Sequence, residues 1–147
     1  MDDLKMQRSN AIIGLIYTKL FEAGLGRVDL SIETVRISDC EILAKNRETW
    51  NADNRLFEDI VEWLAKEGAI YVGKKNVDVS KGIFVFDGGQ LSAKGLSLLK
   101  NLDFSEFGDD KSDRLPQSEN YSPGYYTKFG EFVGGALGGL AKVLANS

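Results

Sequence analysis

The sequence has no histidine and only one cysteine, Cys40. Without an imidazole, the chain has no Ser-His-Asp or Cys-His arrangement, no histidine general base and few ways to hold zinc. A single cysteine cannot form an internal disulfide, so we expect a reducing compartment and a cytoplasmic location. We interpret Cys40 as a small packing residue. The sequence therefore predicts a protein that is not an enzyme and that needs no cofactor or metal.

A long hydrophobic run is also missing. No stretch reaches the roughly 18 apolar residues of a membrane-spanning helix. The longest weakly charged segment, 132–145, is interrupted by Lys142. The chain begins Met-Asp-Asp, without the basic and apolar regions of a signal peptide. We therefore expect a soluble protein.

An excess of positive charge is absent as well. The net charge is −4, and residues 103–120 account for it, with six acidic and two basic side chains. Residues 1–102 carry 15 acidic and 14 basic side chains and are close to neutral. A strong nucleic-acid binder usually has a basic excess. Both prolines also lie between residues 103 and 124, so we predict a solvated acidic linker there.

Before this linker, hydrophobic periodicity predicts four helices and a small sheet. A helix over 10–23 is capped by Ser9 or Asn10, and one over 53–67 is capped by Asp53 and ends at Gly68. A capping-box pattern predicts a short helix over 38–45, and a fourth helix over 91–102 has Ser92 as its cap. Strands are predicted at 28–32, 69–72 and 82–86, with a polar connection at 46–51, a polar loop at 73–81 and a turn at 87–89.

The order of these elements resembles the winged-helix superfamily. The segment 57–70, with sequence FEDIVEWLAKEGAI, is similar to the third helix of such a domain running into the first strand of its wing. The segment 90–96, with sequence QLSAKGL, resembles the step that often follows the wing. The resemblance covers about residues 10–102. It implies an α+β fold of helix, short strand, two helices, β-hairpin wing and helix.

DNA binding is the function for which this fold is best known, with the third helix in the major groove and the wing on phosphate. Here the exposed face of that helix carries two opposite-charge pairs, Arg55–Asp59 and Glu62–Lys66, which is typical of a solvated helix. The wing loop supplies three candidate phosphate contacts, Lys74, Lys75 and Lys81. The carboxylates favour a protein-interaction module over a DNA-binding one.

The last segment, 125–147, predicts an amphipathic helix rich in glycine. Lys128, Glu131 and Lys142 fall on one side, and glycines recur every four residues. Glycine weakens an isolated helix but allows another backbone to come close. We predict an interaction helix formed by these residues: Phe129, Phe132, Val133, Gly134, Leu137, Gly138, Leu140 and Leu144. Its apolar side has three alternative partners: its own domain, a second copy or another protein, or a membrane surface.

The sequence thus predicts three parts: a winged-helix-like domain at 1–102, an acidic linker at 103–124 and a C-terminal helix at 125–147. Our leading hypothesis is a non-enzymatic interaction or regulatory protein whose C-terminal helix mediates self-association or partner docking. The first alternative is a DNA-binding transcriptional regulator that dimerises through its tail. The second alternative is a membrane-surface effector or immunity-type protein. We infer no small-molecule ligand.

Overall fold

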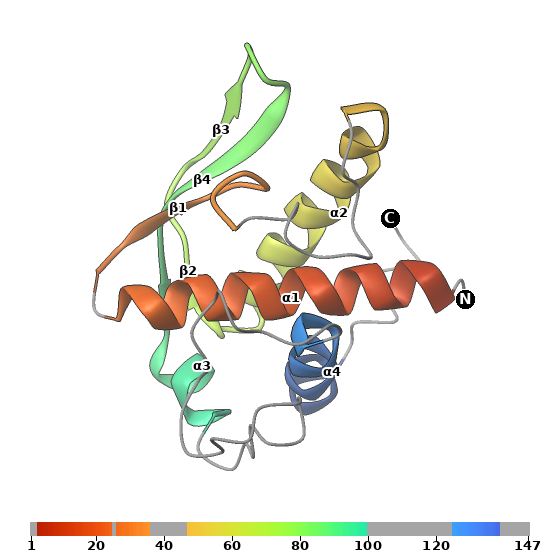
Figure 1. Cartoon of the computed structure of the whole chain (residues 1–147). Coiled ribbons are helices and arrows are strands. Elements are labelled where there is room, and N and C mark those ends of the chain that lie inside the picture. Colours follow the sequence, from red (N-terminus) through yellow and green to blue (C-terminus); the bar gives the residue numbers. More distant parts are fainter. Residues whose placement is uncertain (1–2, 25, 36–46, 100–124, 139–147) are drawn as a thin grey trace.

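The computed structural model describes residues 3–24, 26–35, 47–99 and 125–138. The predicted helix at 38–45, the linker at 103–124 and the chain after residue 138 lie outside these ranges. The described part is an α+β fold with helices packed around a small antiparallel sheet, as the sequence predicts (Figure 1).

The first helix, α1 (Asp3–Ala23), ends at Gly24 as predicted, with φ at 60°. It begins seven residues before the predicted start. The predicted caps are wrong because Ser9 and Asn10 lie buried inside the helix. The Ser9 hydroxyl donates to the Lys5 carbonyl at 2.8 Å, which satisfies it within the helix.

The second helix, α2 (Arg47–Lys66), ends before Gly68, whose φ is 81°. The predicted polar connection at 46–51 and the predicted cap at Asp53 are both wrong, because α2 already begins at Arg47. Asp53 is buried instead, and its carboxylate lies 3.5 Å from the Arg8 guanidinium of α1. A buried carboxylate needs such a partner, so a contact between helices decides the role of this residue.

All strand pairing converges on one strand. β1 (Val28–Leu30), β2 (Ile70–Tyr71) and β3 (Lys75–Asp78) each pair antiparallel with β4 (Ile83–Leu91). The predicted loop at 73–81 therefore contains a strand. The predicted turn at 87–89 is wrong, since β4 continues through Gly88, which has a φ of 60°. The register shifts between Val28 and Leu30, so this part of the sheet is irregular.

The Asn54 side chain makes hydrogen bonds to the backbone near the start of β4, where β1 does not reach. Its Nδ2 donates to the Gly82 carbonyl at 3.2 Å, and its Oδ1 accepts from the Phe84 N–H at 3.0 Å. One amide on α2 thus occupies one backbone group of β4 and one of Gly82 just before it, as a neighbouring strand would. This ties α2 to the hairpin formed by β3 and β4.

Two short elements complete the fold. α3 (Ala93–Ser97) has the predicted cap, because the Ser92 hydroxyl accepts from the Gly95 N–H at 2.9 Å. It begins two residues later than predicted, since Leu91 belongs to β4. α4 (Tyr125–Leu137) is shorter than the predicted C-terminal helix and ends at Gly138, where φ is 73°.

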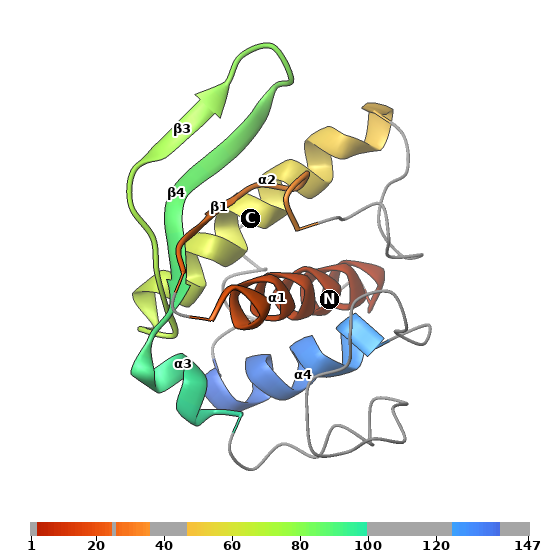
Figure 2. The same cartoon turned by 60° about the vertical axis from the view of Figure 1, so that its left-hand side comes forward.

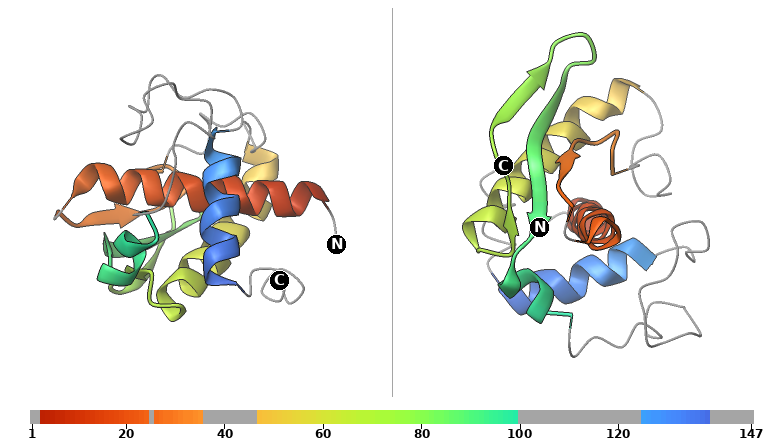
Figure 3. Two further views of the ribbon diagram at one scale, coloured as in Figure 1. Left: turned by 90° about the horizontal axis from the view of Figure 1, so that it is seen from below. Right: turned by 90° about the vertical axis from the view of Figure 1, so that its left-hand side faces the viewer.

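The elements form three layers, with α1 in the middle. The sheet and α2 lie on one side of α1 and α4 crosses its other side (Figure 2), which the view along α1 in the right panel of Figure 3 also shows. Buried apolar side chains from all three layers join in one core: Ile12, Ile16, Leu20, Leu30, Phe57, Ile60, Leu64, Ile70, Phe86, Phe129 and Val133 are among them. The C-terminal helix α4 therefore buries the side of α1 that faces away from the sheet and α2.

Candidate interaction site

The α1–α4 contact occupies the apolar side of the predicted interaction helix. Phe129 and Val133 are fully buried, and the Phe129 ring lies 5.9 Å from the ring of Tyr17 on α1. Phe132 and Leu137 are half-buried against the same core. Of the three partners that the sequence leaves open, the chain's own domain holds this side of α4 in the structure.

Two glycines allow α1 and α4 to cross at backbone distance. A Cβ on Gly14 would overlap the backbone of Tyr126, with 2.8 Å to its carbonyl carbon. A Cβ on Gly130 would overlap the backbone of Asn10, with 2.7 Å to its Cα. The two contacts are four residues apart on each helix, which is one turn. We name this pair of contacts the glycine crossing.

The sequence analysis missed the α1 half of this crossing. The sequence does contain a sign of this contact, because Gly14 interrupts an otherwise apolar stretch of helix from Ala11 to Tyr17. A glycine inside a helix costs about 1 kcal/mol relative to alanine, and close packing is a usual reason for it.

The other predicted residues of the interaction helix have different places. Gly134 is buried, whereas Gly138 ends α4, and a Cβ there would meet nothing within 4 Å. The close approach to α1 thus falls at Gly130, and Gly138 serves the helix end instead. Leu140 and Leu144 lie outside the described residues.

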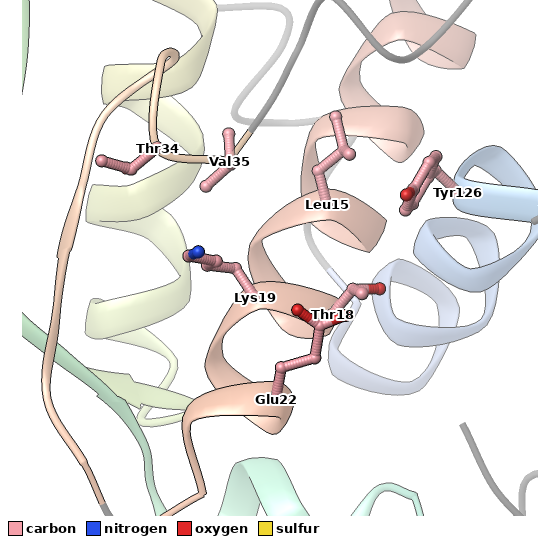
Figure 4. Close-up of a pocket in the computed structure, with 7 residues that line it drawn as sticks. All are labelled: Leu15, Thr18, Lys19, Glu22, Thr34, Val35 and Tyr126. Carbon is pink, nitrogen blue, oxygen red and sulfur yellow. The ribbon is translucent and has the colours of Figure 1, made fainter. Parts of the chain in front are cut away.

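A shallow pocket adjoins the crossing, between α1, the start of α4 and the turn at 31–35 (Figure 4). Leu15, Val35 and Tyr126 supply its apolar lining. Thr18 lines it too, and its buried hydroxyl has no hydrogen-bond partner in the described part of the chain. Burial also leaves the Tyr17 hydroxyl without a partner there and raises the pKa of Tyr17. The mostly apolar surroundings of Tyr17 favour its neutral form.

The predicted phosphate contacts lie on the β3–β4 hairpin. The Lys75 ammonium lies 2.6 Å from a carboxylate oxygen of Glu58 and 3.2 Å from one of Glu62, both on α2. These hydrogen bonds, the one with Glu58 first, raise the pKa of Lys75. Lys81 lies 2.8 Å from Glu33, which raises the pKa of Lys81 in the same way. Lys74 is exposed.

The face of α2 beside the hairpin is acidic. Burial raises the pKa of Asp59, and the neighbouring charges of Glu58 and Glu62 add to the effect. The hairpin thus meets α2 through opposite charges, with Lys75 between Glu58 and Glu62.

No protein-family model, curated protein sequence or solved structure gives a significant match to this chain. Within the described ranges, no helix is long and apolar enough to cross a membrane. Nor do those ranges contain a group of three or more cysteine or carboxylate side chains placed to hold a metal ion.

Proposed function

We propose that this chain is a non-enzymatic interaction or regulatory protein in which α4 is a releasable docking element. In the docked state, α4 covers α1. In the released state, the apolar side of α4 binds a second copy or another protein. The observation that carries the proposal is the glycine crossing, a close backbone contact between α1 and a helix that is weak by itself.

The intrinsic weakness of α4 supports its release. Gly130, Gly134 and Gly135 lie inside it, and each interior glycine costs about 0.5–1 kcal/mol relative to alanine. A helix of 13 residues is also marginal in water. α4 therefore depends on its contacts with α1, and 27 residues of chain separate it from Ser97 at the end of α3. Elements of this kind belong to the less stable parts of a protein.

The rest of the described chain supports a winged-helix-like scaffold for this helix. A long helix, a short strand and a second helix precede the hairpin, and β1 lies on the edge of β4 opposite β3. The scaffold is part of the proposal, and it does not by itself fix a function.

The hairpin charges favour the interaction role over DNA binding. Lys75 and Lys81 would have to exchange Glu58, Glu62 and Glu33 for phosphates. The acidic side chains of α2 would then lie close to the nucleic acid and repel it.

Hydrogen exchange on the full chain tests the proposal. We expect the amides of α4 to exchange through a local opening that leaves the amides of α2 and β4 protected. Exchange of α4 only together with α2 and β4 would show that the helix never leaves α1 alone, and the proposal would be wrong.

Light scattering after size exclusion tests what the released helix does. In the variant Gly130→Ala, the added Cβ displaces α4 from Asn10, so we expect a larger assembly than in the wild type at equal concentration. Gly135→Ala is the matched control, because its Cβ would meet nothing within 4 Å. Equal masses for both variants, with α4 shown to be released, would contradict self-association through α4.

A further inference from the structure

The hairpin has an open edge at β3. Its four residues pair with β4 from Lys75 opposite Phe86 to Asp78 opposite Ile83. In the described part of the chain, no strand pairs with the other side of β3, which lies on the side of β4 away from α2 (Figures 1 and 2). A sheet edge presents a row of backbone donors and acceptors that a further strand can use.

The hydrogen bonds at both ends of β3 show which residues present these groups. The Lys74 carbonyl accepts from the Asp87 N–H at 3.0 Å, and the Asp78 carbonyl accepts from the Gly82 N–H at 2.7 Å. Both carbonyls therefore point toward β4. Because backbone groups alternate in direction along a strand, Asn76 also points inward. Lys75 and Val77 direct their N–H and C=O groups outward.

One usual protection of an edge strand is weakened here. A lysine often guards such an edge with its charge. The ammonium of Lys75 is instead held by Glu58 and Glu62 on α2 and lies 5.4 Å from the centre of the Phe84 ring. Apolar side chains remain outside, since Val77 is 56% exposed and Val79 is 87% exposed. The segment 74–82 contains no proline.

We propose that β3 pairs antiparallel with β3 of a second copy of this chain. Only residues with outward backbone groups can exchange hydrogen bonds, and this restricts the register. A two-fold axis at Val77 satisfies the restriction and places the two exposed Val77 side chains against each other. The same register sets Asn76 opposite Asp78 of the second copy, whereas Val79 lies in the turn beyond the strand. The strand is thus complementary to itself in backbone, apolar contact and polar pairing.

This surface goes beyond the proposed function, because it does not involve α4. A dimer formed through β3 joins two scaffolds while both copies of α4 stay on α1. The two modes of association are separable by substitutions in different elements.

The first test removes one outward hydrogen bond. Val77→Pro deletes a backbone N–H that makes no bond to β4, and proline is tolerated at such edge positions. We expect the wild-type mass to rise toward that of a dimer from low to high micromolar concentration, and the variant to stay a monomer. Val77→Lys is the second variant, to be used if the proline variant fails to fold. It places two like charges at the axis, so we expect it to stay a monomer as well. A wild-type chain that stays monomeric, or folded variants that keep the wild-type mass, would overturn the proposal.

The second test fixes the register by disulfide crosslinking. With Cys40→Ser as the background, Val77→Cys places two thiols on the axis, where facing Cα atoms are about 5.5 Å apart. That distance suits a disulfide. Val79→Cys is the control, since Val79 lies in the turn after β3 and the register does not place it opposite Val79 of the second copy. We expect crosslinked dimer for Val77→Cys only, and equal crosslinking at both positions would overturn the register.

Discussion

Substitution of Gly130 by alanine provides the most direct test of the glycine crossing. The added Cβ would overlap the Asn10 backbone and would lie 2.7 Å from its Cα. Real Cβ atoms essentially never come closer than 3.0 Å to such an atom. Backbone of α1 cannot rotate away as a side chain can. The helix α4 must therefore shift outward or leave α1.

The expected loss of stability follows from what α4 buries. An overpacked contact that is relieved by a small shift costs about 1–3 kcal/mol. Complete release of Phe129 and Val133, both fully buried, would cost about 1.5–3 kcal/mol for each side chain. The higher helix propensity of alanine offsets at most about 1 kcal/mol of this loss of stability. The net loss in the free energy of unfolding is therefore about 0–2 kcal/mol for a small shift and about 2–5 kcal/mol for complete release.

Gly135→Ala makes the same chemical change on the same helix, at an exposed position with no neighbour within 4 Å. We expect it to raise the free energy of unfolding by about 0.5–1 kcal/mol. Urea denaturation of both variants and the wild type, with hydrogen exchange of α4, measures the difference. If Gly130→Ala is as stable as Gly135→Ala, the close contact with Asn10 does not exist and the docking of α4 is wrong.

Three further predictions concern single side chains. Asn54→Leu removes the amide that serves Gly82 and Phe84, and we expect a loss of about 1–3 kcal/mol in urea denaturation. Asp59 has a raised pKa in the folded chain, so its charge lowers stability as the pH rises above the usual range of an aspartate. Asp59→Asn should therefore stabilise the chain at neutral pH by a few tenths of a kcal/mol, and the gain should vanish in acid; no gain at low salt would contradict the cause given for the shift. Gly138→Ala must hold alanine at a φ of 73°, which should cost about 1–2 kcal/mol and increase hydrogen exchange at the end of α4.

Local signals predicted the helix ends well. Gly24 and Gly68 end α1 and α2 in left-handed conformations, and Ser92 caps α3. Each signal depends on the conformational freedom of one residue or on one hydrogen bond within a few residues, so it is visible in the sequence.

The starts of α1 and α2 were predicted too late for the opposite reason. The sequence offers a good capping residue at Ser9 and at Asp53, but both lie inside helices, where the Ser9 hydroxyl bonds to the Lys5 carbonyl. Asp53 meets Arg8 of another helix, and no local pattern contains that pairing. β3 was missed because its pairing with β4 determines the strand, and its own sequence has little strand character.

The candidate site was only half visible. Amphipathicity of the C-terminal helix predicted that Phe129 and Val133 make contacts, and both are buried. The position that receives them could not be predicted from α4 alone, since Gly14 lies 116 residues before Gly130. Only the three-dimensional arrangement shows that these two glycines belong to one contact.

The pairing of β1, β2 and β3 with β4 has a consequence for the synthesis of the chain on the ribosome. β1, β2 and β3 are synthesised before their common partner, so none of these three strand pairs can form until residues 83–91 have emerged. At about 5–20 residues per second, about 3–12 s pass between the synthesis of Val28 and that of Gly89, its partner in the ladder. Slow translation just after β4 would give the sheet time to assemble before α4 is made.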